Sequence, residues 1–352
     1  MAEYKNQHYV PQFYFKYFND EKNYINMMLK NNGKIISNVS IKNQCSKSYF
    51  YCNKNNEKNV IKPFEDECKL IWDILRKSNI TQLSTIDLKR LCFSIIFQHS
   101  RTHDLAHYRS SANKAFAKNM FDEMVNDFHK KYCCSEDDFL LLEKLKAKKN
   151  IGIDEEYCRL FNIGLSCHSF MAIEDLKICL LKNKTNIPFI FSDSPVVFYN
   201  MYNINSLHLL ASGLMAFFPL DNETCLFLYD KNNYITSFID ENIYHDIINK
   251  LQLYQATNAV YFSSQNKLIK KNIINWWKDE KKDLKSIHDY SKKQSKNEIK
   301  VIKPMDYKNL KLSFIDMNTP MDISQVCRNI KMQQYIEENP FRPNVNSRLI
   351  SM

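Results

Sequence analysis

The chain has 352 residues, of which 44% are hydrophobic and 13% aromatic, so it can bury a sizeable core as one large domain or two modest ones. Its formal net charge of +10 favours acidic partners, such as nucleic acid, over basic ones. It has only 4 glycines and neither a G-x-x-x-x-G-K nor a G-x-G-x-x-G pattern, which argues against the standard nucleotide-binding loops.

The 11 cysteines are spaced without any C-x-x-C pair, which predicts buried reduced thiols rather than a disulfide framework or a zinc knuckle. No basic segment followed by an apolar core begins the chain, and no apolar run reaches the length of a membrane span. We therefore expect a cytoplasmic protein without membrane association.

An aromatic cluster marks the N-terminus, where His8-Tyr9-Val10-Pro11-Gln12-Phe13-Tyr14 is followed by Tyr17 and Phe18. Disordered termini avoid such clusters because they cannot bury them. Pro11 suits the first turn of a helix, where its missing N–H is not needed. The pattern predicts an extended arm that ends in a short docked helix, with His8 just ahead of that helix.

The first half then reads as a hairpin and a series of helices. Asn31-Asn32-Gly33 is typical of a turn between two strands, and Ser84 to Asp87 resembles a capping box that starts a long helix. The predicted elements are strands at Tyr24–Leu29, Ile35–Val39 and Ser48–Tyr51, and helices at Pro63–Ser78, from Ser84 through Tyr132 with a break near Arg109–Ser111, at Glu136–Lys148 and at Glu155–Leu165.

Short apolar runs bounded by turn residues dominate the second half and predict strands. They lie at Lys177–Leu181, Phe189–Phe191, Val196–Tyr199, Leu214–Pro219, Cys225–Tyr229 and Ala259–Phe262, with helices at Glu241–Ala256 and Gln265–Trp277, a linker at Lys278–Lys300, and a tail from Val301 with a strand and a helix near Ser324–Ile336.

Because strands and helices are segregated, we expect an α+β fold in which long helices pack on a mostly antiparallel sheet. The N-terminal arm is docked on it by its aromatic cluster. We place a main domain at residues 1–264 and a basic C-terminal extension at 265–352.

Four polar side chains stand in apolar surroundings and form the candidate catalytic set. They are His8, Gln98, Arg101 and Asp193. A histidine can shuttle protons near neutral pH, and an arginine binds phosphate with two hydrogen bonds. An aspartate can orient the histidine or hold a divalent metal ion. A divalent metal ion is therefore the cofactor that these four residues would use. The structural alternative is that these side chains are buried and serve only to specify the fold.

At these positions the chain resembles the domain-of-unknown-function family 4238 over residues 6–264. The resemblance is carried by His8 to Phe15, by Gln98, Arg101 and Thr102 of a Q-x-x-R-T segment, by Ser192, Asp193 and Pro195 of an S-D-N-P turn, by Pro219-Leu220, and by Asn249, Gln252 and Ala256 of an N-x-x-Q-x-x-x-A helix. His103 stands where the family has proline after the threonine, and Ser194 stands where it has asparagine. The resemblance implies which residues matter and no activity.

The segment from Lys267 to Lys311 holds 14 lysines against 6 acidic residues, with aromatic residues between them. Such a pattern is typical of surfaces that bind a phosphate backbone and unstacked bases, although a solvated surface helix has the same composition. The candidate nucleic-acid contacts are Lys270, Lys271, Trp276, Trp277, Lys278, Lys281 and Lys282.

Several weaker patterns remain open. Arg101 and His107 fit the R-x4–6-H spacing of the helical ribonucleases called HEPN domains, and His99, His103 and His107 share a helix face that could hold a metal. The apolar residues Met120, Phe121, Met124 and Phe128 could form either an interface in a homo-oligomer or part of the core. Cys167 and His168 are adjacent in sequence, which does not make a catalytic thiolate pair.

Two functions follow as hypotheses. The first is a nucleic-acid-directed hydrolase, a nuclease-like toxin or phage-defence effector acting on RNA or DNA. In it His8 is the general acid or base, Gln98 and Arg101 hold phosphate, and Asp193 orients His8 or binds metal. The second is a non-catalytic module that binds a ligand or partner, in which these four residues are structural.

Overall fold

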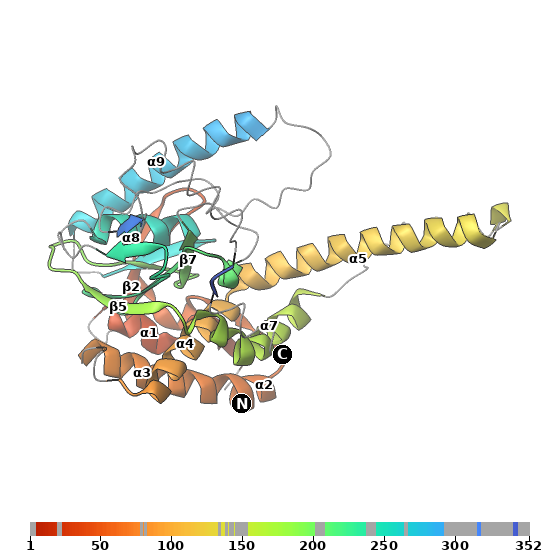
Figure 1. Ribbon diagram of the computed structural model, residues 1–352. Helices are drawn as coiled ribbons and strands as arrows, with labels where there is room; N and C mark the ends of the chain where they lie inside the picture. The colour runs from red at the N-terminus through yellow and green to blue at the C-terminus, as the bar shows by residue number, and fades with distance from the viewer. Residues whose placement is uncertain are drawn as a thin grey trace.

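The computed structural model describes residues 5–19, 23–77, 80, 83–132, 135–137, 140, 144, 154–200, 208–236, 244–263, 267–291, 315–317 and 341–343. Within these ranges every pair of strands is antiparallel. Helices α1, α3, α4 and α7 lie on one side of the strands, and α8 and α9 lie on the other (Figure 1). The predicted α+β fold is confirmed, with its strands divided between separate sheets.

Two four-stranded sheets form the centre of the molecule, in the orders β3-β2-β11-β6 and β5-β9-β8-β7. Two-stranded pairs β1-β4 and β10-β12 accompany them. The strands are β1 Asn6–His8, β2 Tyr24–Leu29, β3 Ile35–Ser40, β4 Ser46–Ser48, β5 Lys177–Lys182, β6 Phe191–Ser192, β7 Val197–Asn200, β8 Leu214–Pro219, β9 Thr224–Tyr229, β10 Tyr234–Thr236, β11 Ala259–Phe262 and β12 Ile315–Met317.

The predicted hairpin is confirmed as β2 and β3, joined by a turn in which Gly33 has a φ of +70°. Glycine adopts this left-handed conformation without the steric penalty of a Cβ. The strand predicted at Ser48–Tyr51 lies earlier, as β4, because Tyr49 and Cys52 have positive φ values that turn the chain out of the extended conformation. β4 pairs with β1, so this short ladder holds the backbone of His8 in place.

The helices are α1 Gln12–Tyr17, α2 Lys54–Asn56, a π-helical turn at Glu57–Ile61, α3 Lys62–Lys77, α4 Thr85–Ser100, α5 His103–Tyr132, α7 Glu155–Ser169, α8 Tyr244–Gln255 and α9 Lys267–Ser291, with 3-10 turns at Ile41–Asn43, Phe170–Ile173 and His208–Leu210. The capping box at Ser84 is confirmed: the Ser84 hydroxyl accepts from the Asp87 backbone N–H, and the Asp87 carboxylate accepts from the Ser84 backbone N–H.

Two predictions about helices are corrected. The break in the long helical stretch falls at Arg101 and Thr102 rather than near Arg109–Ser111, because Arg101 is the C-cap of α4. The predicted linker from Lys278 onward is helical as far as Ser291, and Glu280 continues the helical spacing of the buried Ile269, Ile273 and Trp276. Of the helix predicted at Glu136–Lys148, residues 136, 137, 140 and 144 are described, and all four are helical. The helix predicted at Ser324–Ile336 lies outside the described residues.

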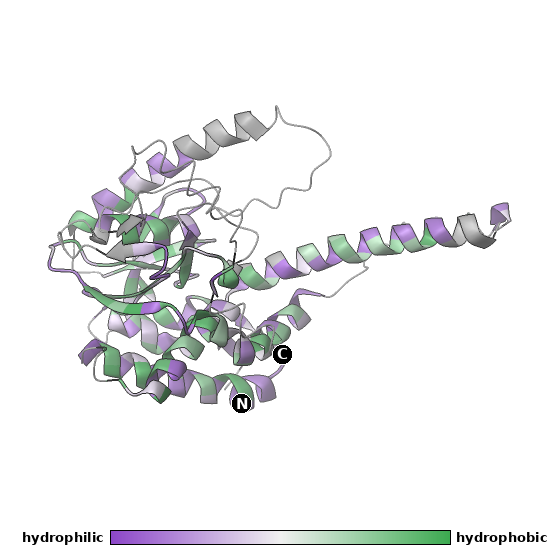
Figure 2. Cartoon of the chain, in the orientation of Figure 1, coloured by the Kyte–Doolittle hydropathy of each residue, from purple (hydrophilic) through white to green (hydrophobic). Residues whose placement is uncertain are grey.

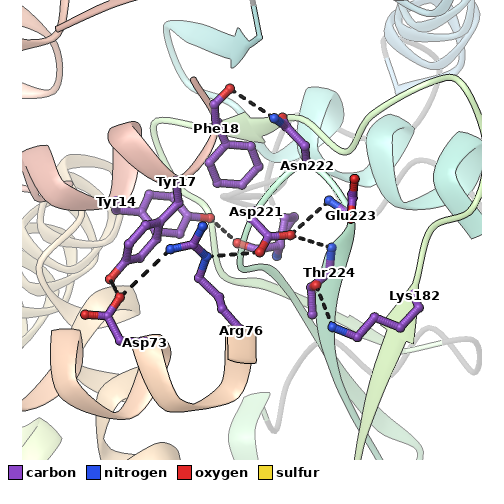
Figure 3. Close-up of polar contacts among 11 residues, drawn as sticks. Tyr14, Tyr17, Phe18, Asp73, Arg76, Lys182, Asp221, Asn222, Glu223 and Thr224 are labelled. Carbon is purple, nitrogen blue, oxygen red and sulfur yellow. Dashed lines mark hydrogen bonds and ion pairs between the residues drawn. The ribbon is translucent and has the colours of Figure 1, made fainter. Parts of the chain in front are cut away.

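The N-terminal arm is docked as predicted, through α1 (Figure 3). Tyr14 is completely buried and its hydroxyl donates a hydrogen bond to the Pro219 carbonyl. The hydroxyl of Tyr17 donates to Oδ1 of Asp73 on α3 at 2.6 Å, while the guanidinium of Arg76 lies 4.0 Å from the Tyr17 ring. Arg76 also donates to Asp221 at 3.0 Å. The aromatic helix is thereby fixed between α3 and the β8–β9 turn.

The C-terminal part of the chain contacts the body at the residues that are described. α9 buries Ile269, Ile273 and Trp276 in a second apolar core that lies against the sheet containing β2. Arg342 is completely buried and binds both carboxylate oxygens of Asp175. The predicted boundary at residue 264 stays a prediction. Among the described helices, none combines the length and the hydropathy that a membrane span requires.

Candidate functional site

Three of the four predicted catalytic residues lie together around the N-terminal arm. Gln98 donates from Nε2 to the Tyr9 carbonyl at 3.0 Å, and Arg101 donates from Nη2 to the His8 carbonyl. The imidazole of His8 donates from Nε2 to the Lys42 carbonyl at 3.1 Å. Each side chain therefore uses a backbone carbonyl as its partner, so the Q-x-x-R segment of α4 holds the main chain of the arm rather than its imidazole.

Arg101 is 1% exposed, and its guanidinium is bound on several sides. Besides the His8 carbonyl, it donates to the Tyr51 hydroxyl at 2.9 Å and to Oε1 of Glu65 at 2.5 Å. Burial alone would lower the pKa of Arg101, but Tyr51 and Glu65 outweigh that effect and raise it. The guanidinium remains charged and is shielded from solvent, which leaves it little access to a phosphate.

Two carboxylates that were not predicted accompany Arg101. Glu65 on α3 forms the ion pair, and Glu57 lies in the π-helical turn just before that helix. Burial raises the pKa of Glu57 to about 7, with Arg101 acting in the opposite direction. Oε2 of Glu57 and Oε1 of Gln98 are buried without a hydrogen-bond partner among the described residues. Single-turn π-helical segments often occur at functional sites, so Glu57 is a candidate for a titratable group near neutral pH.

Asp193 belongs to a second network. Its carboxylate accepts hydrogen bonds from the backbone N–H groups of Thr257 and Asn258 at 2.9 and 2.8 Å and from Nδ2 of Asn258 at 3.0 Å. Burial raises the pKa of Asp193, and the hydrogen bonds from Thr257 and Asn258 counteract the increase. This aspartate caps the turn that connects α8 to β11.

The second network also fixes the segment that passes from one sheet to the other, because β6 ends at Ser192 and β7 begins at Val197. Gln252 of α8 accepts from the backbone N–H of Ser192 at 3.0 Å and donates to the Pro195 carbonyl at 2.8 Å. Asn249, one helical turn earlier, binds the backbone at Pro188 and Ile190 in the same way. The side-chain amides of Asn249 and Gln252 thus form hydrogen bonds with backbone groups of the crossing segment, as a neighbouring strand would.

The structure thus brings His8, Gln98 and Arg101 together and leaves Asp193 in a separate network. Among the described residues, no hydrogen bond or ion pair joins the carboxylate of Asp193 to any of the other three. All four side chains are buried. Burial also lowers the pKa of His8, which favours the neutral form of the imidazole.

The predicted nucleic-acid residues lie on α9 and fall into two groups. Trp276 is buried, and Trp277 is half-buried and donates from Nε1 to the Lys30 carbonyl at 2.7 Å. The two indoles therefore attach the helix to the sheet. Two half-buried lysines also take part in this contact: the Lys281 ammonium lies 5.8 Å from the centroid of the Trp277 ring, and Lys270 donates to the Ser37 hydroxyl at 3.2 Å. Lys271 and Lys278 are exposed. Lys282 lies within α9, and its side chain is outside the described residues.

The helical histidines contact a carboxylate on the neighbouring helix. His103 and His107 of α5 each lie 3.4 Å from an oxygen of Glu155 on α7, and Arg159 lies 2.9 Å from the same carboxylate. His99 instead packs its ring edge-on against Phe198. In the part of the chain that the structure describes, no group of three or more His, Cys, Asp or Glu side chains is arranged to hold a metal ion.

Glu65 was missed by reasoning from the sequence, although a pattern pointed to it. It occupies a position on the apolar face of α3, at helical spacing with Ile61, Cys68 and Trp72, all of which are buried. A carboxylate at such a position needs a buried cation. Because the sequence has few arginines, Arg101 was one of the few candidates for the cation that pairs with Glu65.

A family model described as "Protein of unknown function (DUF4238)" matches residues 6–266. No curated protein matches the chain, and no solved structure does. The matched region contains both polar networks and ends just before α9.

Proposed function

Since the chain belongs to the DUF4238 family, whose description assigns no activity, we propose a function from its geometry: a non-catalytic module that binds nucleic acid. In this proposal His8, Gln98, Arg101 and Asp193 stabilise the fold, and the lysine-bearing face of α9 contacts the phosphate backbone. The burial of Arg101, with its guanidinium bound to Glu65, Tyr51 and the His8 carbonyl, is the observation that carries the structural role.

The support for nucleic acid comes from how charge is arranged on α9. Lys271 and Lys278 are seven residues apart, so they share one face of the helix, and both are exposed. Glu280 faces the protein instead, where it forms an ion pair with Lys30 at 3.0 Å. Asp279, beside Lys278, is exposed as well. On the described part of α9 the two exposed lysines therefore outnumber the one exposed carboxylate, which favours a polyanion at this surface.

The tryptophans support this proposal in a different way from the one the sequence indicated. Because Trp276 and Trp277 pack against the sheet, they hold the helix rigidly rather than stack on bases. The proposed contact is therefore with phosphates, which position a nucleic acid without reading its sequence. We expect little discrimination between sequences and a strong dependence on salt.

Binding to fluorescently labelled RNA and DNA over a range of salt concentrations tests the proposal. Replacing Lys271 and Lys278 by glutamate should weaken binding and flatten the plot of log affinity against log salt, by roughly 0.9 per lost phosphate contact on duplex DNA. The matched control replaces Lys77 and Lys89, exposed lysines on α3 and α4, by glutamate and should leave the slope unchanged. Equal effects from both pairs would contradict a specific role of α9.

The hydrolase hypothesis makes a different prediction in the same assay. If the protein is a nuclease that uses His8, then the intact protein degrades RNA or DNA, with or without added divalent metal ions, and a folded His8→Ala variant does not. Under our proposal neither protein degrades the nucleic acid. Degradation that depends on His8 would overturn the non-catalytic role and favour the toxin or defence effector.

A further inference from the structure

The outer half of α5 carries a row of large apolar side chains in water. Phe116 is 64% exposed, Met120 46% and Met124 65%. Residues four apart lie on the same side of a helix, so the three side chains form one stripe. Figure 1 shows this half of the helix extending away from the body of the molecule, and Figure 2 shows hydrophobic residues alternating with hydrophilic ones along it. A stripe of this kind on an extended helix is typical of a surface that another protein covers.

The stripe continues a packing face that is already used nearer the body. Arg109, seven residues before Phe116, lies on that same face and donates to Asn162 of α7 at 2.6 Å. The ion pair between Lys114 and Asp154, at 3.1 Å, marks the level at which α7 begins. Beyond this level the same face of α5 is exposed, so a further helix could lie on it as α7 does closer to the body.

The charges beside the stripe indicate what covers it. Glu123 and Asp127 are exposed and lie at helical spacing with Met120 and Met124. Acidic groups on this face oppose contact with a nucleic acid or an anionic membrane, both of which are negatively charged. A protein surface remains as the chemically compatible occupant.

The spacing of the stripe fits a second copy of the same chain. An interface between identical subunits related by a twofold axis must match its own surface, and Phe116 and Met124 are equally far from Met120. In an antiparallel pair centred on Met120, Phe116 of each copy meets Met124 of the other. A parallel pair would instead place the carboxylates of Glu123 against each other.

We propose that two copies of the protein associate through antiparallel pairing of their α5 helices, with Phe116, Met120 and Met124 at the contact. This proposal refines the apolar set expected from the sequence: Phe116 joins Met120 and Met124, Phe121 is half-buried, and the side chain of Phe128 lies outside the described residues. It is independent of nucleic-acid binding by α9, which lies elsewhere on the molecule (Figure 1).

Light scattering during size-exclusion chromatography of the full-length protein, over a range of concentrations, tests the association. We expect twice the monomer mass for the unmodified protein and the monomer mass for Phe116→Asp. Lys118→Asp is the matched control, because Lys118 is exposed on the same helix but two residues away from Phe116, on another face. Circular dichroism verifies that both variants are folded.

Cross-linking tests the orientation separately. In the antiparallel pair the two copies of Met120 face each other, so Met120→Cys should form a disulfide-linked dimer under mild oxidation, and Lys118→Cys should not exceed the unmodified protein. A monomeric unmodified protein would overturn the proposal. So would a dimer that survives Phe116→Asp, or equal cross-linking through positions 118 and 120.

Discussion

Nη2 of Arg101 lies 2.5 Å from Oε1 of Glu65, and both side chains are buried. The same Nη2 donates to the His8 carbonyl, so the ion pair between α3 and α4 also holds the N-terminal arm. Breaking a buried ion pair from one side leaves an uncompensated charge in a medium of low dielectric constant. Three segments that are distant in the sequence therefore depend on one guanidinium.

Replacing Arg101 by methionine should strongly destabilise the fold. We expect the free energy of unfolding in urea to fall by about 3–5 kcal/mol, because Glu65 becomes a buried charge without a partner. The double variant Arg101→Met/Glu65→Met should recover much of the loss. Arg90→Met is the control, since Arg90 lies on the same helix with an exposed side chain, and its effect should stay within about 0.5 kcal/mol. A double variant no more stable than Arg101→Met would contradict this explanation.

Asp193→Ala should also destabilise the protein, for a different reason. The substitution leaves the N–H groups of Thr257 and Asn258 without their acceptor, at a cost of about 1–3 kcal/mol. Asp193→Asn keeps one acceptor oxygen and should cost less. Thermal unfolding measures both effects. If Asp193 only caps this turn, affinity for nucleic acid is unchanged in the fraction of each variant that remains folded.

The fold could be predicted from the sequence where a pattern is local. The turn at Gly33, the capping box at Ser84 and the short apolar runs that form β8 and β9 all depend on neighbours within a few residues. The end of α4 at Arg101 could not be predicted in this way, because Arg101 itself has a good helical propensity. Its guanidinium binds partners on β1 and α3, and these long-range contacts decide where the helix stops.

For the candidate site, the sequence identified four polar residues and gave no means of knowing their partners. Gln98 and Arg101 bind backbone carbonyls of residues 8 and 9, and a carbonyl group has no signature in the sequence. Asp193 and Gln252 likewise bind main-chain groups. The same residue type can either hold a backbone segment or act on a substrate. Only the three-dimensional contacts therefore distinguish a structural role from a catalytic one.

Glu57 should make stability depend on pH. Its pKa in the folded protein is raised to about 7 from an ordinary value of 4.5, mainly by burial. The folded state therefore holds the proton more tightly, and the free energy of unfolding should fall as the pH rises from about 4.5 to about 7. Glu57→Gln removes this dependence and should stabilise the protein at pH 8 by on the order of 1–2 kcal/mol, after allowance for solvent screening.

Urea unfolding at pH 4, 6 and 8 measures the effect of Glu57→Gln. Glu67→Gln is the control, because Glu67 is an exposed glutamate on α3 whose removal should leave the pH dependence unchanged. At pH 4, where Glu57 itself is protonated, Glu57→Gln should have almost no effect. A stabilisation of equal size at pH 4 and pH 8 would show that ionisation of Glu57 is not its cause.

Two glycines allow a paired test of how α9 is attached. At Gly33 an added Cβ would lie 2.9 Å from the ring of Trp277, and φ is +70°. Gly33→Ala should therefore destabilise the protein by about 1–2 kcal/mol and change the tryptophan fluorescence. At Gly164, in the middle of α7, a Cβ would meet nothing within 4 Å. Gly164→Ala should stabilise the protein by up to about 1 kcal/mol, because alanine favours the helix.

The critical result is that Gly33→Ala lowers the free energy of unfolding while Gly164→Ala raises it, since both substitutions add a single methyl group. If Gly33→Ala is neutral, the indole of Trp277 can move aside and its hydrogen bond to the Lys30 carbonyl contributes little to holding α9. In that case the basic face of α9 is not held rigidly. If the attachment is loose, nucleic-acid binding by Gly33→Ala should depend on salt as strongly as binding by the unmodified protein does. If the attachment is rigid, the substitution displaces α9, and binding by Gly33→Ala should depend on salt less strongly.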